Sequence, residues 1–266
     1  MSKTILITGS TDGIGFETAK SLLSQGHRVL IHGRSENKLS ATASKLRAIN
    51  SNYAIETYCA DLSSFSEVEK LAAAVSEKHS KVDVLINNAG VFVVPNPLTE
   101  NGLDVRFVVN TIAPWLLTQR LLALIPSDGR VVNLSSAAQA PVDLQALVGR
   151  AKLDSNQAYA QSKLALTMWS SHLANSLGAE GPAIIAVNPA SFLGSKMVKE
   201  AYGSNGNDLQ IGADILSRAA ISEEFAHASG RYFDNDQRRF ASPHPDALDA
   251  TKNKKLVDAI ESLLQP

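Results

Sequence analysis

The first ninety residues alternate short apolar runs with longer amphipathic segments, and this alternation restricts the fold more than any other feature of the chain. Strand-like runs cover Ile5–Thr8, Arg28–His32, Ile55–Cys59 and Val82–Ile86. Segments with helical spacing lie between them, at Ile14–Leu23, Ser35–Ile49 and Ser64–Lys78. Short apolar strands separated by helices indicate a parallel sheet that is covered by helices on both faces. The sequence therefore predicts an α/β fold with a doubly wound parallel sheet.

The second half of the chain continues the same pattern. It predicts a long helix over Leu103–Ile125, a tight turn at Ser127–Gly129, a strand over Arg130–Leu134, a helix over Asn156–Leu177 and a strand over Ala183–Val187. Helices interrupted at Gly203, Gly206 and Gly212 are expected within Ser195–Ala220, followed by an edge strand at Arg231–Phe233 and a last helix over Pro245–Leu264. The chain has no low-complexity linker and no internal repeat, so residues 1–266 are predicted to form a single domain.

Composition narrows the class of partner. The formal net charge is −1, which gives no electrostatic reason to expect nucleic acid or an anionic membrane. The single cysteine, Cys59, cannot form an intrachain disulfide and is expected to be a buried structural thiol. The six histidines show no metal-ligand spacing, so no metal site is expected. Neither a signal peptide nor a membrane span is evident in the sequence, and we expect a cytoplasmic protein that acts on a small molecule.

Tyr159 and Lys163 are the first candidates for catalysis. A spacing of four residues on a helix places both side chains on one face, about one turn apart. An ammonium about 4 Å from a phenol would favour tyrosinate by roughly 4 kcal/mol at an effective dielectric near 20. This would bring a tyrosine, with an ordinary pKa of about 10, closer to neutral pH, less what burial opposes. The alternative is that this spacing is accidental, as it often is on amphipathic helices.

A glycine-rich turn, Thr8–Gly15, follows the first strand and opens the first helix. Its glycines, in the spacing G-x-x-x-G-x-G, would let the backbone approach a pyrophosphate at the helix N-terminus. We therefore predict that a dinucleotide contacts Gly9, Ser10, Asp12, Gly13, Ile14 and Gly15 in a Rossmann-type fold. The spacing differs from the common G-x-G-x-x-G fingerprint, and a plain helix start with turn glycines is the alternative.

Arg34 indicates which dinucleotide would bind. About 20 residues after the glycines, NAD-binding sites tend to place an acid, whereas a 2′-phosphate requires arginine. The second strand ends in His32–Ser35, which contains no acid, and Arg34 could form a charge-assisted contact with the phosphate. We favour NADP over NAD, although Arg34 could also be a solvated surface residue.

With these segments in place, the chain resembles the short-chain dehydrogenase/reductase family over most of its length. The motifs that carry the resemblance occur in the family's order. They are the turn Thr8–Gly15, the adenine-side pair Asp61 and Leu62, the strand end Asn87–Asn88–Ala89–Gly90, the helix residue Asn110, the pair Ser135 and Ser136, and Tyr159 with Lys163. The long insert between Ser136 and Tyr159, and the segment Ser229–Phe233, resemble the mostly NADP-dependent, retinol-dehydrogenase-like branch.

The resemblance implies a role for each of four residues. Tyr159 would be the general acid and base that moves the proton, and Lys163 would lower its pKa and hold the nicotinamide ribose. Ser136 would hydrogen-bond the substrate oxygen, and Asn110 would hold a water that connects Lys163 to solvent. Asn88, Ala89, Gly90 and Pro189 would also contact the cofactor. Taken alone, Ser136 could be a strand-end hydrogen-bonding residue and Asn110 a polar helix residue.

Several positions depart from the family pattern. Ala190 follows Pro189 where the family usually has glycine, Phe192–Ser195 replaces a segment that often carries a threonine near the carboxamide, and Ala113 replaces a glycine. Residues 190–220 are expected to form a substrate-binding lid segment. Apolar residues near the expected cleft suggest a hydrophobic carbonyl or alcohol substrate; these are Phe92, Val94, Phe192, Leu193 and Met197.

Two functions of different classes follow from the sequence. The first is an NADP-dependent reductase or dehydrogenase acting on a carbonyl/alcohol pair. The second is an NADP(H)-binding sensor or scaffold protein without turnover. The complete set of Asn110, Ser136, Tyr159 and Lys163 favours the enzyme. The two long helices carry apolar residues that core packing explains in part, and the family often dimerises through these helices, which implies a homodimer or homotetramer.

Overall fold

The protein is described by a computed structural model that covers residues 2–50 and 55–265. Its strands form one eight-stranded sheet in the order β3-β2-β1-β4-β5-β6-β7-β8, parallel except for the antiparallel pairing of β8 with β7. The strands are β1 (Thr4–Ile7), β2 (Arg28–Gly33), β3 (Glu56–Cys59), β4 (Val84–Asn87), β5 (Arg130–Leu134), β6 (Ala183–Asn188), β7 (Tyr232–Asp234) and β8 (Arg239–Ala241). The predicted doubly wound sheet is confirmed.

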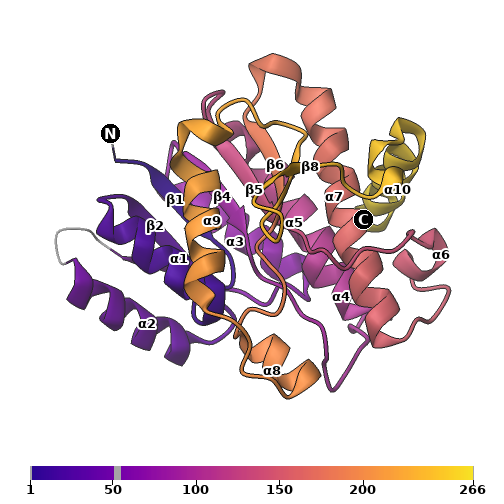
Figure 1. The fold of residues 1–266 in the computed structure, drawn as a ribbon, viewed down its shortest axis with the longest axis horizontal. Coiled ribbons are helices and arrows are strands. Elements are labelled where there is room, and N and C mark those ends of the chain that lie inside the picture. Colours follow the sequence, from indigo (N-terminus) through magenta and orange to yellow (C-terminus); the bar gives the residue numbers. More distant parts are fainter. Residues whose placement is uncertain (1, 51–54, 266) are drawn as a thin grey trace.

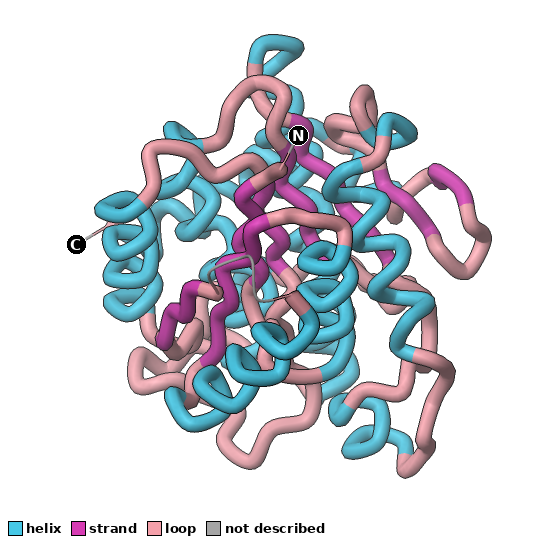
Figure 2. The backbone as a smooth tube through the Cα atoms, turned by 90° about the vertical axis from the view of Figure 1, so that its left-hand side faces the viewer, coloured by secondary structure: helices cyan, strands magenta, loops and turns pink. Residues whose placement is uncertain are grey.

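Helices cover both faces of this sheet (Figures 1 and 2). One layer contains α1 (Gly13–Ser24), α2 (Glu36–Ile49) and α9 (Leu209–Ile221). The other layer contains α3 (Phe65–Lys78), α5 (Ala113–Leu121) and α7 (Ser155–Leu177), and α10 (Ala250–Leu264) packs on α7. Shorter helices are α4 (Val105–Phe107), α6 (Leu144–Leu147) and α8 (Lys196–Tyr202).

Alternation along the strands produces two separate hydrophobic cores. Neighbouring residues of a strand point to opposite faces, so Leu6 packs in the core beneath α3, α5 and α7, whereas Ile5 and Ile7 pack in the core beneath α1, α2 and α9. All three side chains are fully buried. The sheet is therefore covered on both faces, as the unbroken apolar runs of the sequence predict.

Three sequence-based expectations are wrong, each because of how an element packs in the folded chain. The strand expected at the edge is β7, which lies inside the sheet because β8 pairs with it. Gly212 does not interrupt a helix; it lies within α9, where an added β-carbon would be 2.6 Å from Leu193 Cδ1, so glycine permits close packing there. Cys59 is exposed, because β3 is an edge strand and its side chains alternate between buried and exposed.

The helix expected over Leu103–Ile125 is divided into four parts. After α4, the backbone forms a π-helical turn (η1, Val108–Ile112), continues as α5 and ends in a 3₁₀ turn (η2, Leu122–Leu124). The stretch Val105–Leu124 is long and apolar enough to cross a membrane, but 72% of its most apolar window is buried inside the structure. The core helix of a globular protein has the same properties.

The expected segment 190–220 has two parts that pack differently. Its second part, α9, has a buried face against α1 and belongs to a helical layer of the fold. The first part contains α8, which ends at Gly203 in the left-handed conformation. Only this first part remains a candidate for a lid.

Candidate active site

The glycine-rich turn connects β1 to the N-terminus of α1. Gly9 has φ +64°, and a β-carbon there would be 2.8 Å from Ala89 Cα. A β-carbon at Gly15 would be 2.5 Å from Gly9 O and would also clash with Asn88 Nδ2. Asp12 caps the helix by accepting a hydrogen bond from Gly13 N. The turn therefore requires glycine at two positions and directs the start of α1 at the adjoining pocket.

The strand end after β4 holds this turn in place. Asn88 Nδ2 donates to Thr8 O (2.8 Å) and to Gly9 O (3.0 Å). In return, Thr8 Oγ1 accepts from Asn88 N (3.0 Å) and Ala89 N (3.1 Å). These four hydrogen bonds explain why the two motifs, 80 residues apart, form one surface.

His32 is a further support of the turn that the sequence did not indicate. Its ring is buried at the end of β2, where Nδ1 accepts from Gly9 N (3.1 Å) and Nε2 lies 3.1 Å from Ala60 O. An amide N–H can only donate and a carbonyl can only accept, so the ring is the neutral Nε2–H tautomer. Burial lowers the pKa of His32 to about 4. The ring therefore remains neutral at physiological pH and joins the ends of three strands.

The adenine-side end of the pocket is basic. Arg34, after β2, and Lys38, in the first turns of α2, both line it. Ser35 caps α2 by accepting from Lys38 N (3.4 Å). Asp61 and Leu62 line the same pocket, and Asp61 Oδ1 accepts from Ser63 N (2.9 Å). Two cations at one end of a pocket can bind a phosphate group.

Tyr159 and Lys163 lie on α7 at the other end of the same pocket. Lys163 Nζ is 5.7 Å from the centre of the Tyr159 ring and donates to Leu134 O (2.8 Å). Complete burial lowers the pKa of Lys163 to about 8. Phe92 is an apolar neighbour of Tyr159, and the centres of the two rings lie 4.7 Å apart. The one-face arrangement predicted from the spacing is present, with the ammonium near the ring.

Asn110 lies in the π-helical turn and is buried. Its Oδ1 accepts from Val91 N (2.8 Å), and its Nδ2 donates to Val91 O (2.9 Å) and to Ser162 Oγ (3.0 Å). It therefore holds the segment after β4 against α7. A β-carbon at Gly90 would be 3.3 Å from Asn110 Oδ1 and 3.4 Å from Lys163 Nζ, so these two polar atoms flank Gly90. The predicted role of Asn110 in holding a water stays a prediction.

The two serines after β5 have different environments. Ser135 is buried and its hydroxyl lies 2.7 Å from Thr167 Oγ1. Ser136 is half-buried, and its Oγ accepts from Ala138 N (3.1 Å). A hydroxyl that accepts one hydrogen bond can still donate its own proton. Ser136 Oγ can therefore still donate a hydrogen bond, but Ser135 lines the cavity and Ser136 does not, so the role expected of Ser136 stays a prediction.

The segment after β6 departs from ordinary backbone geometry. Pro189 lines the pocket, and Ala190 has φ 112°, in a region that favours glycine. The replacement noted in the sequence therefore places an alanine in a glycine conformation. Such strain is of the order of 1–3 kcal/mol and requires support from neighbouring residues.

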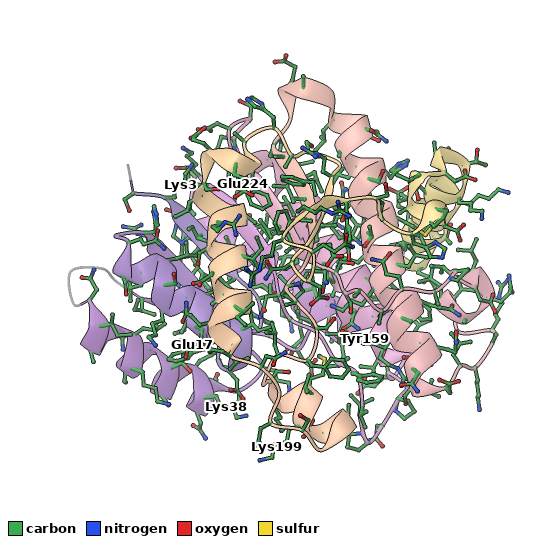
Figure 3. The ribbon with its side chains drawn as sticks, viewed as in Figure 1. Lys3, Glu17, Lys38, Tyr159, Lys199 and Glu224 are labelled. Carbon is green, nitrogen blue, oxygen red and sulfur yellow. The ribbon has the colours of Figure 1, made fainter. Side chains whose placement is uncertain are left out.

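One cavity of 360 Å³ joins most of these residues. The predicted residues that line it are Gly9, Asp12, Gly13, Ile14, Gly15, Arg34, Asp61, Leu62, Asn88, Ala89, Gly90, Tyr159, Lys163 and Pro189. The labelled side chains Lys38 and Tyr159 both lie in the lower half of the view in Figure 3. Three predicted residues do not line the cavity: Ser10 is buried and hydrogen-bonded to His32 O and Ile7 O, Asn110 supports the wall, and Ser136 lies beside it.

Several lining residues were missed from the sequence. They include Thr11, His32, Lys38, Ser195 and Lys196, whereas Met197 was expected near the cleft and lines the cavity. Lys38 could have been found, because it lies four residues after Arg34 on the next helix. No local signal marks Ser195 and Lys196, at the start of α8, as cavity residues. Across residues 2–50 and 55–265, no group of three or more His, Cys, Asp or Glu side chains could hold a metal ion.

Comparison with known proteins identifies the family. Residues 3–205 match the family model described as short chain dehydrogenase. Human retinol dehydrogenase 13 is 30% identical over 273 residues, covering 96% of this chain and 82% of the relative. Human polyprenol dehydrogenase is 32% identical over 277 residues, covering 97% of this chain and 82% of the relative.

Solved structures indicate the same family. A protein from Mycobacterium paratuberculosis superimposes with a TM-score of 0.81 at 28% identity, covering 98% of this chain and 92% of its own. A short chain dehydrogenase from Shigella flexneri, solved with NADP, gives a TM-score of 0.70 at 26% identity, covering 88% of this chain and 97% of its own. The chain is therefore a member of the short-chain dehydrogenase/reductase family, in its retinol-dehydrogenase-like branch.

Proposed function

We propose that this protein is an NADP-dependent oxidoreductase that transfers a hydride between the nicotinamide and a carbonyl/alcohol substrate. The observation that carries the proposal is the continuity of one cavity from the basic pair Arg34 and Lys38, past the glycine turn, to Tyr159 and Lys163. A phosphate-binding end and a proton-transferring end in one cavity suit a dinucleotide with a substrate at its reactive end.

The residues present fit NADP. A β-carbon would clash at Gly9 and at Gly15, so the backbone of the turn is bare at these two positions. The N-terminus of α1 supplies amides for a pyrophosphate. Arg34 and Lys38 would bind the 2′-phosphate, and no acid replaces them at the end of β2. The NADP complex of the Shigella flexneri family member supports this assignment. When bound, the nicotinamide supplies or accepts the hydride.

The chain itself would supply the proton. Tyr159 Oη would donate it to a carbonyl oxygen in reduction and remove it from an alcohol in oxidation. A positive Lys163 beside the ring would lower the pKa of the phenol and hold the nicotinamide ribose. Ser136 Oγ would donate a hydrogen bond to the same substrate oxygen and stabilise developing negative charge. Asn110 would keep the Gly90–Val91 segment in register with α7 and hold the water that connects Lys163 to solvent.

An apolar substrate fits the walls near Tyr159. Phe92 packs against the tyrosine ring, and Met197 lines the cavity. Val93, Leu98 and Phe192, on the segments after β4 and β6, are about half exposed. Of the five apolar residues expected near the cleft, Met197 lines the cavity, whereas Phe92, Val94, Phe192 and Leu193 do not; Leu193 is buried against α9. Two relatives, retinol dehydrogenase and polyprenol dehydrogenase, are also named after apolar alcohols.

The test is a turnover assay with NADPH and NADH against decanal, benzaldehyde and acetophenone, with the alcohols in the reverse direction. Tyr159→Phe should lower kcat at least about 100-fold, because general acid catalysis is removed. Tyr58→Phe, which removes a buried hydroxyl on β3, is the control and should leave kcat unchanged. Undiminished turnover in Tyr159→Phe would contradict the mechanism.

Cofactor choice is tested separately. Arg34→Ala should weaken NADPH binding by about 10- to 100-fold and leave NADH binding unchanged, because a charged hydrogen bond is lost. Arg120→Ala, which removes an exposed arginine paired with Glu69, is the control. NADPH binding by the wild-type protein without turnover of any substrate would favour the sensor or scaffold function instead.

A further inference from the structure

The segment that follows β6 is held in two unusual backbone conformations. Ala190 has φ 112° and Phe192 has φ 53°. Non-glycine residues adopt such angles only where neighbouring structure imposes them. Because Pro189 in the same segment lines the cavity, whatever imposes these angles also shapes the cavity wall.

The turn between β7 and β8 supplies this support. Asp236 Oδ1 accepts from Ser191 N (2.8 Å), and Asp236 Oδ2 accepts from Ser191 Oγ (2.6 Å) and from Asn188 Nδ2 (2.9 Å). Asn235 Nδ2 donates to Pro189 O (3.0 Å). Burial of Asp236 favours the neutral acid, but these hydrogen bonds from Ser191 and Asn188 outweigh it and lower the pKa of the carboxyl. One charged side chain therefore fixes both sides of Ala190.

The same hairpin also reaches the catalytic serine. Tyr232 lies on β7, which pairs with β6, yet its hydroxyl extends to the strand end after β5 and donates to Ser136 O (3.1 Å). Gln139 Nε2 donates to the same carbonyl (2.9 Å). Tyr232 is buried, and burial raises the pKa of its phenol, so the hydroxyl remains a donor. The backbone of Ser136 is thus tied to the hairpin.

We propose that the β7–β8 hairpin positions the active site, with Tyr232 setting Ser136 and Asp236 setting Pro189–Ser191. Both are positioning residues: neither lines the cavity, and each acts through a residue that would contact the substrate oxygen or the cofactor in the proposed function. The inference rests on the proposed function, since it assigns Ser136 to the substrate oxygen and Pro189 to the nicotinamide side. Its consequence is a fixed distance between these two groups, on which the hydride transfer depends.

The test uses Tyr232→Phe, which removes the hydroxyl and keeps the ring, and Asp236→Asn, which replaces two acceptors of a carboxylate by one acceptor and one donor. The matched controls are Tyr58→Phe and Asp246→Asn, which make the same chemical changes at β3 and beside α10. Each protein is assayed with NADPH and the carbonyl that the wild type reduces fastest in the panel above.

Both hairpin variants should lower kcat about 10- to 100-fold, since a misplacement of about 1 Å reduces turnover by that order. Binding of 2′,5′-ADP, which carries only the adenine end of the cofactor, should stay within about twofold of the wild type. This contrast separates positioning from a general loss of structure, which would weaken both. Hydrogen exchange should quicken at Ser191 in Asp236→Asn and not in Asp246→Asn.

The inference is overturned if both hairpin variants retain wild-type kcat, or if their loss of kcat is matched by an equal loss of 2′,5′-ADP binding. It is also overturned if the two control variants lose as much kcat as the hairpin variants. These results differ from a failure of the proposed function, in which the wild-type protein itself shows no NADPH-dependent turnover of any substrate. In that case the hairpin has no reaction to position, and the inference fails together with the function.

Discussion

Lys163 should make the protein less stable at neutral pH than at alkaline pH. Its ammonium is completely buried on α7, and burial lowers its pKa from 10.5 to about 8. Between these two values the unfolded chain holds a proton that the folded chain lacks, so the free energy of unfolding rises as the pH rises. At about 1.4 kcal/mol per pKa unit, the wild-type protein gains about 3 kcal/mol over this range from this residue.

The perturbation is Lys163→Met, which keeps an unbranched side chain of similar length and removes the charge. The variant lacks this gain, so the stability of the wild type relative to Lys163→Met should increase by about 3 kcal/mol from pH 8 to pH 10.5. Loss of the hydrogen bond to Leu134 O adds a constant offset that does not depend on pH. The variant should also lose turnover, so it separates stability from function at this position.

The assay is urea unfolding at several pH values, followed by the fluorescence of Trp115 and Trp169, which are both buried. Lys255→Met, at an exposed position on α10, is the control for removing a lysine. Stability curves of wild type and Lys163→Met that run parallel from pH 8 to pH 10.5 would refute the reasoning. A wild type that loses stability relative to the variant as the pH rises would refute it more strongly.

Three further substitutions test individual supports of the site. His32→Leu should weaken NADPH binding, because the acceptor for Gly9 N is lost. It should also remove the pH dependence that His32 gives the wild type, which loses about 3 kcal/mol as the pH falls from 6.5 to 4, because the unfolded histidine binds a proton there and the buried one does not; acid-unfolding curves of both proteins would show this. Ala190→Gly should raise the free energy of unfolding by about 1 kcal/mol, since relief of φ strain exceeds the entropy cost of glycine; an unchanged urea midpoint would argue against strain at Ala190. Gly15→Ala should weaken NADPH binding at least about 10-fold, because its β-carbon would displace the turn from Asn88; unaltered affinity in a titration would show that the turn can adapt.

Much of the site could be predicted because its signals are local in the sequence. Tyr159 and Lys163 share one helix, so their spacing alone places them on one face. The glycine turn lies between a strand and a helix that are both evident from periodicity. The alternation of short apolar runs with helical segments likewise predicted both hydrophobic layers, because the inner parallel strands are buried on two faces.

The expectations that failed depend on packing between distant segments. The burial of Cys59 was wrong because no local pattern shows that β3 lies at an edge of the sheet. The break at Gly212 was wrong because a glycine that ends a helix and one that allows close packing look identical in a sequence. Core packing within the chain accounts for the apolar residues Trp115 and Trp169, which are buried and whose ring centres lie 5.5 Å apart. The predicted oligomer therefore stays a prediction.

By itself, the sequence determined the sheet, the dinucleotide turn and the tyrosine–lysine pair, because strand alternation, helix spacing and glycine geometry act over a few residues. Only the tertiary structure decided what supports them. His32 reaches Gly9 across 23 positions, Asp236 reaches Ser191 across 45, and Tyr232 reaches Ser136 across 96. These contacts follow from the order of strands in the sheet, which places β2 beside β1 and β7 beside β6, and periodicity carries no record of that order.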